Sequence, residues 1–370
     1  MKILINVSCN KGGGIQVCDG LIRTLGDFAD HKFIVCATSE VMSSLGSGFE
    51  VPKNVVILPR PPQTMCQRLL SRYPAMDRIV SEQRAEAVFT VFGPSYWKPK
   101  VPHLCGFAIS HYVFPESGFQ RKRPWKKRLL VFLYKTVQMH SFKHHADALV
   151  VENPIIGDRL KTIYGVSEVY TAYNTCNPVF FDEKRWDRTI SLPEFQGATI
   201  LTLASYYPHK NLDILVPTAR VLKKTYPAFR FRFVLSIKRE QLNADLSEVE
   251  DAFIFLGSVP ISRCPWLYKQ ADIMLLPTQL ECFSASWAEA MVMGVPIITS
   301  DLPFAHGICE DAACYVDQDS PNKLAEAIFA LSHSSERRQQ LIDRGKIVRL
   351  KFADAHTRAR KCLDIIEKMC

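Results

Sequence analysis

The sequence predicts an α/β protein with two doubly wound parallel sheets. Short apolar runs alternate with helix-like stretches along the whole chain, which is typical of strands buried between layers of helices. The length of 370 residues suits two domains, and a hydrophobic content of 47% allows two sizeable cores. Residues 174–197 contain Asn and Pro and few repeated apolar positions, and they separate the runs into two series. We therefore expect one domain over residues 1–176 and a second over residues 177–351.

Strands are expected where short apolar runs are bounded by turn-forming residues. In the first domain these runs are residues 3–7, 33–37, 55–58, 87–92, 104–108, 148–151 and 169–173. In the second domain they are residues 200–204, 231–237, 253–256, 273–276, 296–299 and 314–316. Residues 351–368 carry an imperfect apolar stripe at helical spacing, so we expect a helix there.

Two carboxylates eight positions apart, Glu281 and Glu289, form the most informative local pattern. Glu281 follows the apolar run 273–276, and the residues after it are compatible with a helix. We therefore expect Glu281 in the loop at the carboxyl end of a strand and Glu289 inside the next helix, about 12 Å further along. Ligands bind at this end of open α/β sheets, and a helix N-terminus suits phosphate. The alternative is two surface acids on an amphipathic helix.

This segment resembles the donor site of retaining glycosyltransferases of family 4, which have the GT-B fold and a Glu-x7-Glu motif in this setting. The resemblance covers residues 199–350 well and the first domain loosely. It implies two Rossmann-like domains that face a cleft, with helix 352–370 crossing back onto the first domain. It also implies a nucleotide-sugar donor whose ribose contacts Glu289. The donor sugar would contact Glu281 and the residues after it, Cys282, Phe283 and Ser284.

A glycine cluster, which includes Gly13 and Gly14, follows the first apolar run and precedes a helix expected to begin near Ile15. Glycine lets backbone N–H groups come close to an anion. The cluster matches neither a dinucleotide fingerprint nor a Walker loop. It is similar to the donor-phosphate loop of the family 4 enzymes, and a plain tight turn is the alternative.

Lys210 follows the first strand of the second domain and is expected to meet the donor diphosphate and neutralise leaving-group charge. The family commonly has an Arg about five positions before this Lys, and Ser205 stands there instead. Ser cannot supply the bidentate charged clamp of Arg. Lys238 or Arg239 could compensate; a weaker enzyme or a chain without catalysis are the other interpretations. An ordinary solvated lysine is the alternative for Lys210.

Three further positions are assigned by the same resemblance. Val259 is the Val of a Gly-x-Val turn that is similar to the wall around the nucleobase. His111 lies at the carboxyl end of the run 104–108, where a His of the resembling enzymes orients the reacting groups; a structural His is the alternative. Tyr112 and Glu116 are additional candidates for the acceptor side.

The net charge of +9 has a location. Eight cations and no acids lie between Phe119 and His145, whereas the rest of the chain has 38 basic and 37 acidic residues. The first part of this segment contains Arg121, Lys122, Arg123, Trp125, Lys126, Lys127 and Arg128. Cations mixed with aromatic residues suit an anionic membrane surface or glycolipid, which we favour over nucleic acid. In the remaining alternative the segment is a solvated face whose apolar side, residues 129–134, packs into the domain.

Together these patterns predict a retaining glycosyltransferase that uses a nucleotide-sugar and a lipid-linked saccharide, lipopolysaccharide or other glycan acceptor. No cofactor or metal is implied, because a lysine and a helix dipole can stabilise the leaving group. Twelve scattered Cys without a Cys-x-x-Cys favour a reducing cytoplasm, and the basic segment favours the inner face of the membrane. A GT-B nucleotide-sugar epimerase and a non-catalytic nucleotide-sugar-binding subunit remain alternatives.

Overall fold

The computed structural model describes residues 1–9, 12–46, 48–121, 124–352 and 354–370. The chain divides into two compact units. The first comprises Met1–Pro115, Lys122–Thr175 and Ala353–Cys370, and the second comprises Glu116–Arg121 and Cys176–Phe352. The main crossing between the units therefore falls between Thr175 and Cys176, within one residue of the domain boundary expected from the sequence.

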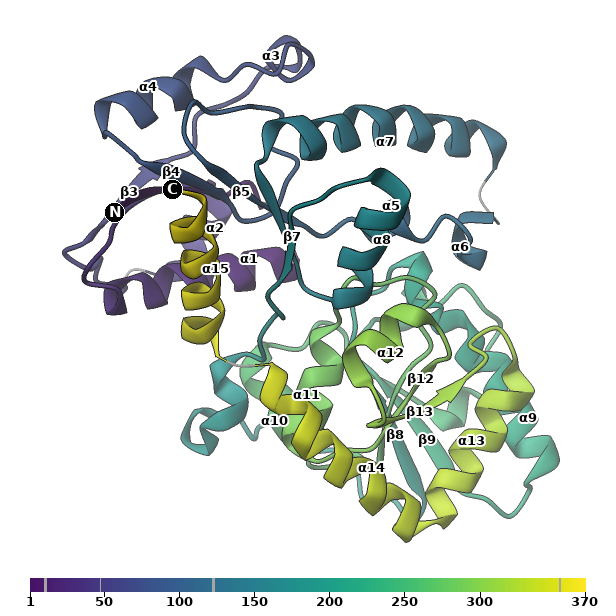
Figure 1. Cartoon of the computed structure of the whole chain (residues 1–370). Coiled ribbons are helices and arrows are strands. Elements are labelled where there is room, and N and C mark those ends of the chain that lie inside the picture. Colours follow the sequence, from purple (N-terminus) through teal and green to yellow (C-terminus); the bar gives the residue numbers. More distant parts are fainter. Residues whose placement is uncertain (10–11, 47, 122–123, 353) are drawn as a thin grey trace. The chain divides into compact units, whose positions relative to one another are not determined.

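The first unit contains a seven-stranded parallel sheet with the order β3-β2-β1-β4-β5-β6-β7 (Figure 1). Its strands are β1 (Lys2–Asn6), β2 (Lys32–Ala37), β3 (Val55–Pro59), β4 (Ala87–Thr90), β5 (His103–Phe107), β6 (Ala148–Val151) and β7 (Val169–Thr171). Most of these residues are buried, as expected for strands covered on both faces.

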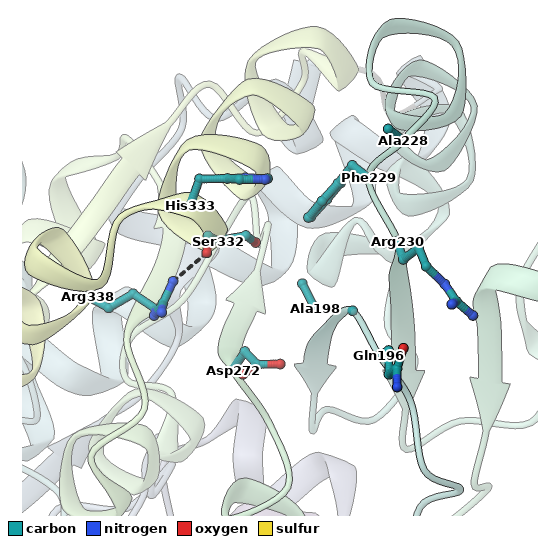
Figure 2. Close-up of a pocket in the computed structure, with 10 residues that line it drawn as sticks. Gln196, Ala198, Ala228, Phe229, Arg230, Asp272, Ser332, His333 and Arg338 are labelled. Carbon is teal, nitrogen blue, oxygen red and sulfur yellow. Dashed lines mark hydrogen bonds between the residues drawn. The ribbon is translucent and has the colours of Figure 1, made fainter.

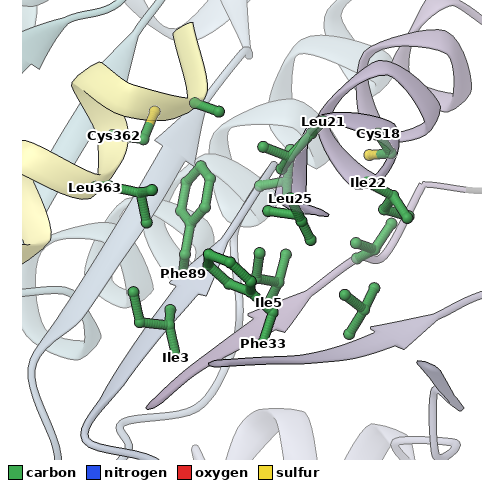
Figure 3. Close-up of a cluster of buried hydrophobic side chains, with 14 of the residues drawn as sticks. Ile3, Ile5, Cys18, Leu21, Ile22, Leu25, Phe33, Phe89, Cys362 and Leu363 are labelled. Atoms are coloured by element: carbon green, nitrogen blue, oxygen red, sulfur yellow. The ribbon is translucent and has the colours of Figure 1, made fainter. Parts of the chain in front are cut away.

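The helices of the first unit are α1 (Gly13–Thr24), α2 (Ser39–Leu45), α3 (Met65–Leu69), α4 (Pro74–Glu82), α5 (Ser110–Val113), α7 (Trp125–His145), α8 (Pro154–Tyr164) and α15 (Ala355–Met369). The last of them joins elements from the start of the chain. Cys362 and Leu363 of α15 belong to the same buried cluster as Leu21 of α1 and Phe89 of β4 (Figure 3). The helix expected near the end of the sequence therefore completes the core of the first unit.

The second unit contains a six-stranded parallel sheet with the order β10-β9-β8-β11-β12-β13. Its strands are β8 (Ala198–Thr202), β9 (Phe231–Leu235), β10 (Phe253–Phe255), β11 (Ile273–Leu276), β12 (Ile297–Ser300) and β13 (Ala313–Val316). Its α-helices are α6 (Gly118–Arg121), α9 (Leu215–Thr225), α10 (Cys264–Tyr268), α11 (Ala285–Met293), α12 (Pro303–Cys309), α13 (Pro321–His333) and α14 (Ser335–Val348). A separate buried cluster of side chains from β8, β9, α9 and α13 forms its core.

Each of the predicted apolar runs overlaps a strand, and the strand ends differ from the prediction by no more than two residues. The predicted α/β class with two parallel sheets is therefore confirmed. The helix expected to begin near Ile15 begins at Gly13 instead. Gly12 has a φ of 67°, which turns the chain into the helix two residues earlier than the side-chain pattern indicates.

Candidate active site

The second sheet reverses its order of strands between β8 and β11. From β8 the chain builds outward through β9 and β10, and from β11 it builds in the other direction through β12 and β13. Loops that leave such a central pair at their carboxyl ends diverge and leave a crevice, where open α/β sheets bind ligands. Lys210 lies in the loop after β8, and Glu281 lies in the loop between β11 and α11. The topology therefore places both predicted residues at one point.

Lys210 and Glu281 form an ion pair through Lys210 Nζ and Glu281 Oε1. Their side chains are only 13% and 9% exposed, so both charges are largely removed from solvent. A buried charge is costly unless it is paired and hydrogen-bonded, and each partner here compensates the other. An ammonium group has three N–H donors and a carboxylate has about four acceptor positions, so the pair retains capacity for further polar contacts. The ordinary solvated lysine is therefore the wrong interpretation of Lys210.

Hydrogen bonds hold the loops of this pair in place. Thr278 Oγ1 lies 3.1 Å from Glu281 Oε1 and 3.1 Å from the carbonyl oxygen of His209, so its single proton can be donated to either. The N–H of Gln279 also donates to the carbonyl of His209, at 2.7 Å. On the other side, Ser300 Oγ donates to the carbonyl of Thr278 at 2.5 Å. The loops after β8 and β11 are thereby tied to each other and to the end of β12, which restricts the positions of the two charged groups.

Glu289 lies inside α11, as predicted, and is 7% exposed. The hydroxyl of Tyr268, which ends α10, lies 3.1 Å from Glu289 Oε2 and 3.1 Å from the carbonyl of Ser286. Burial raises the pKa of Glu289 to about 7, although the Tyr268 hydrogen bond and the charge of Lys210 act in the opposite direction. Glu289 therefore changes its charge near neutral pH. The interpretation of Glu281 and Glu289 as surface acids is wrong, because both are buried.

Further donor-side residues predicted from the sequence lie in the loops after β10 and β11 and differ in exposure. Cys282 and Ser284 are buried, and Ser284 occupies the N-cap of α11 without a side-chain capping bond. The half-buried Phe283 packs edge-on against Phe352, with ring centroids 5.7 Å apart. Val259 is half-buried in the loop after β10. Gly257, two residues before Val259, has a φ of 69°, so the chain makes a tight turn directly after this edge strand.

Ser205 is exposed in the loop after β8. Of the two cations considered as replacements for the family's Arg, Arg239 pairs with Glu250, with 2.7 Å between Arg239 Nε and Glu250 Oε1. Lys238 is exposed, and its Cγ lies 3.8 Å from where a Cβ would stand on Gly257. Arg239 is therefore already engaged in an ion pair, and a compensating role for Lys238 stays a prediction.

The first unit has the same kind of reversal, between β1 and β4, and the glycine cluster follows β1 there. Gly13 and Gly14 are the first residues of α1, so their N–H groups belong to the unpaired donors of a helix N-terminus. A Cβ on Gly14 would lie 3.0 Å from Cys9 Sγ, whereas a Cβ on Gly13 would meet nothing within 4 Å. Of these two glycines, only Gly14 is therefore closely packed.

His111 and Tyr112 lie in α5, which follows β5. Tyr112 is buried, and its hydroxyl donates to Gln138 Oε1 of α7 at 2.8 Å. The half-buried ring of His111 packs edge-on against Tyr112, with ring centroids 4.4 Å apart. Glu116 is exposed and lies in the short segment that belongs to the second unit.

The basic segment contains α7, whose apolar side chains are mostly exposed. Trp125 is 69% exposed, and Leu129, Leu130, Phe132, Leu133 and Tyr134 are each between 52% and 61% exposed. The alternative in which residues 129–134 pack into the domain is therefore wrong. Lys126 and Arg128 are exposed on the same helix. Lys122 and Arg123 lie outside the described residues, as do the side chains of Arg121 and Lys127.

No helix among the residues described is long and apolar enough to cross a membrane. The same residues hold no group of three His, Cys, Asp or Glu that could bind a metal ion. One Asp-x-Asp sequence, Asp317-Gln-Asp319, does follow β13. Asp319 accepts from Gln279 Nε2 at 2.6 Å, and Asp317 accepts from the backbone N–H of Asp319 at 3.0 Å. These carboxylates therefore brace the turn and the loop after β11.

A cavity of about 390 Å³ lies at the end of the second sheet opposite to Lys210 and Glu281 (Figure 2). Ala198 begins β8 and Asp272 immediately precedes β11, so this cavity lies at the amino ends of the strands. Arg338 uses its guanidinium to donate to the carbonyls of Leu331 and Ser332, at 2.9 and 2.5 Å. The cavity is thus remote from Lys210 and Glu281, and Arg338, one of the two arginines that line it, donates to carbonyls at the end of α13.

Sequence reasoning missed Thr278 and Tyr268, the two hydroxyl partners of the predicted carboxylates. Thr278 stands three positions before Glu281, and a hydroxyl so close to a motif carboxylate was a usable signal. Tyr268 is 21 positions from Glu289, and the two meet only because α10 and α11 pack together. No local sequence pattern predicts the contact between Tyr268 and Glu289.

Fold and site together define an α/β protein with two parallel sheets and charged residues at the switch point of the second. The chain is similar in structure to a glycosyltransferase from Rickettsia africae, with a TM-score of 0.72 and 13% identity over 100% of this chain and 98% of that one. It is also similar to Anabaena HepE in complex with UDP and glucose, with a TM-score of 0.67, 14% identity and 99% coverage of both chains. The fold is GT-B.

The family described as Glycosyl transferases group 1 matches residues 184–348, which lie within the second unit. The O-antigen chain mannosyltransferase RfbU of Salmonella typhimurium is 26% identical over 225 residues, which is 60% of this chain. The chain spans 58% of the length of that curated relative.

Proposed function

We propose that this protein is a retaining glycosyltransferase that moves a sugar from a nucleotide-sugar to a saccharide acceptor. The observation that carries the proposal is the buried Lys210–Glu281 pair at the switch point of a group 1 domain. A buried cation beside a buried carboxylate suits a ligand that has both an anionic diphosphate and sugar hydroxyls. HepE, in complex with UDP and glucose, has the same fold.

In this mechanism Lys210 donates to the diphosphate of the donor and stabilises the charge that develops on the leaving group. Glu281 accepts hydrogen bonds from hydroxyls of the donor sugar, and Thr278 keeps its carboxylate oriented. Glu289 accepts from the ribose hydroxyls. His111 orients the reacting groups. The leaving phosphate assists deprotonation of the acceptor on the same face of the sugar, so anomeric configuration is retained.

No divalent metal takes part in this proposal, because Lys210 and the N-terminus of α11 supply the positive potential. The Asp317-Gln-Asp319 sequence is the point at which to challenge it. Turnover that persists in EDTA supports a metal-free reaction, whereas loss in EDTA and recovery with Mg²⁺ or Mn²⁺ would contradict it. The variant Asp317→Asn is the matched control, because it removes one of the two carboxylates that could hold a metal ion and leaves Lys210 unchanged.

The acceptor is proposed to be a glycan or glycolipid at the inner face of a membrane. The exposed apolar side chains and the cations of α7 support this location, since such a surface suits an anionic headgroup layer. The similar protein RfbU is an O-antigen chain mannosyltransferase, which favours a glycan acceptor. Co-sedimentation with vesicles of 30% anionic lipid, compared with neutral vesicles, tests the membrane contact. Equal binding to both would leave the cations without a role.

Ser205 favours one second candidate, a subunit that binds a nucleotide-sugar without transferring it. An exposed Ser cannot replace a charged clamp, and Arg239 is already paired with Glu250. The two functions differ in one measurable way. Donor binding without hydrolysis or transfer across a panel of acceptors supports the binding subunit, whereas transfer to one of the acceptors supports the transferase. An isomer formed from the donor without any acceptor would instead support the epimerase.

The central experiment is a thermal-shift screen against nucleotide-sugars, followed by turnover with the donor that binds. Binding to the native state raises apparent stability. In the variant Glu281→Gln, shape and size are kept while the charge is lost. We expect kcat to fall about 100-fold, as for removal of one oriented charged contact in a transition state. Unchanged turnover in Glu281→Gln would remove the basis of the proposal.

A further inference from the structure

Two free thiols of the first unit lie in contact at the start of α1. Cys9 follows β1, Cys18 lies in α1, and Cys18 Sγ donates a weak hydrogen bond to Cys9 Sγ across 3.7 Å. This separation exceeds the length of a disulfide bond by about 1.7 Å. The two side chains must therefore approach each other by that amount before a bond between the sulfur atoms can form.

Gly14 leaves the space that this contact occupies. A Cβ at position 14 would lie 3.0 Å from Cys9 Sγ. Gly14 and Cys18 are four positions apart in α1 and so share one face of the helix. The sulfur of Cys9 therefore lies along that face, against the glycine and beside the second thiol. A movement of this sulfur toward Cys18 is transmitted directly to the first turn of α1.

The two thiols have different surroundings. Cys9 is half-buried, whereas Cys18 is fully buried in the core cluster of the unit (Figure 3). The pKa of Cys9 is lowered because Cys18 donates to it, although burial and Glu152 act in the opposite direction. The same hydrogen bond and burial raise the pKa of Cys18 well above its ordinary value. Since the thiolate is the reactive form, an oxidant from solvent reacts first with Cys9.

We propose that Cys9 and Cys18 are a modification site, at which hydrogen peroxide converts the two thiols into a reversible disulfide. The new bond ties the end of β1 to the second turn of α1 and displaces Gly14. The effect on activity rests on the proposed function. Because the N–H groups at the start of α1 are those predicted to contact the donor phosphate, oxidation weakens binding of the nucleotide-sugar.

The reaction consists of two balanced steps. In the first, the Cys9 thiolate attacks one oxygen of the peroxide, the O–O bond breaks, and a sulfenic acid forms on Cys9. The departing hydroxide takes up the proton that the Cys9 thiol released and becomes water. In the second, the Cys18 sulfur attacks the Cys9 sulfur, the S–O bond breaks, and a second water leaves with the Cys18 proton. One peroxide is thus reduced to two waters while two thiols lose two electrons, and a thiol reductant reverses the change by exchange.

The first test maps the disulfide in the full chain. The protein is treated with a small molar excess of hydrogen peroxide, remaining thiols are blocked with N-ethylmaleimide, and the product is digested with trypsin. Cleavage between the two cysteines places Cys9 in peptide 3–11 and Cys18 in peptide 12–23. We expect mass spectrometry to find these peptides joined, and to find them separate after dithiothreitol. Recovery of the two peptides separately without reductant would overturn the proposal.

The second test measures donor binding before and after oxidation, with matched variants. Cys9→Ser removes the reactive thiol of the pair, and Cys66→Ser removes an exposed thiol outside it. In wild type and Cys66→Ser we expect peroxide to weaken nucleotide-sugar binding about tenfold, the order expected for loss of a hydrogen bond to a charged group. Dithiothreitol should restore the affinity, and Cys9→Ser should be insensitive to peroxide. Equal weakening in Cys9→Ser would assign the effect to another thiol and overturn the link to the donor. Cys9→Ala is the second variant if Cys9→Ser does not fold.

The modification site and the donor site can fail separately. Joined peptides in a protein whose reduced form binds no nucleotide-sugar would sink the proposed transferase and leave the modification site. Donor binding and turnover by the reduced protein without joined peptides would sink the modification site alone. Joined peptides with unchanged donor affinity would overturn the proposed effect of oxidation on the donor.

Discussion

The two sheets reverse their strand order in the same way but carry different chemistry at the reversal. In the second unit the loops after β8 and β11 place a buried ion pair there, and neighbouring hydroxyls and backbone groups hold it. In the first unit the loop after β1 places the glycine cluster there, beside Cys9 and Phe92. The comparison teaches that topology sets the place where a ligand can bind, whereas the loop residues decide whether charge or backbone N–H groups contact it.

The strongest way to break this comparison is to remove the cation of the second unit. Lys210→Met keeps the length of the side chain but leaves Glu281 buried without a counter-ion and the leaving group without its cation. We expect kcat to fall by about 1,000-fold, in line with loss of a single oriented donor to a developing charge. The control is Lys224→Met, an exposed cation in the last turn of α9, which should change kcat by no more than a few-fold. Equal losses in the two variants would show that general positive potential, and not the buried pair, is what matters.

The second prediction concerns Glu289, the buried acid of α11 in the second unit. Burial raises the folded-state pKa of Glu289 to about 7, above its ordinary value of 4.5, so the folded state prefers the protonated form. The stability contribution is therefore complete below about pH 4.5 and is lost as pH rises through 7, a loss of the order of 3 kcal/mol. Glu289→Gln should be more stable than wild type at pH 8 and similar at pH 4.5, measured by urea unfolding.

The same substitution should weaken donor binding, because Gln lacks the negative charge that attracts ribose hydroxyls. In the wild-type protein, donor affinity should rise between pH 6 and pH 8 as Glu289 ionises, and the Glu289→Gln variant should lose this dependence. A pH dependence of donor binding that survives in Glu289→Gln would assign it to another group.

A smaller effect is expected in the first unit, where backbone and packing matter more than charge. Gly14→Ala places a Cβ 3.0 Å from Cys9 Sγ, whereas Gly13→Ala meets nothing within 4 Å. We expect Gly14→Ala to raise the KM for donor about tenfold through displacement of the turn, and Gly13→Ala to raise it less than threefold. The reverse order would show that a ligand contacts Gly13 itself and that packing of Gly14 is unimportant.

The smallest effect concerns the position where the family has an Arg. Ser205→Arg adds a cation to an exposed loop position after β8. If the missing Arg makes the native protein a weak enzyme, Ser205→Arg should raise kcat/KM severalfold. If Lys238 already compensates for the missing Arg, kcat/KM should stay within twofold, and Ser205→Arg should raise it only when it is added to Lys238→Met. A fall in kcat/KM would mean that the loop is shaped for a small residue at this position.

Most of the fold could be predicted because buried parallel strands have a recognisable sequence, namely short apolar runs. The positions of Glu281 and Glu289 followed from the same pattern, since a strand, a loop and a helix succeed one another there. The assignment of Lys210 and Glu281 to one donor site came from a family resemblance, and the strand order gives the physical reason that the two side chains lie together; their direct ion pair was not predicted.

Other features depend on contacts that no local pattern encodes. The hydrogen bond between Tyr268 and Glu289 exists because two helices pack together, and the start of α1 is set by the backbone of Gly12. The exposure of Leu129 to Tyr134 was equally hidden, because an apolar stripe has the same sequence whether it faces a core or solvent.

The place of α15 in the first core has a consequence for how the protein is made. Ala359, Cys362, Leu363, Ile365 and Ile366 belong to the cluster that also contains Ile3 and Ile5. Chains usually fold domain by domain from the amino terminus as they leave the ribosome. Here the first unit must wait until the whole of the second has been translated, so its incomplete apolar surface is exposed to chaperones throughout synthesis.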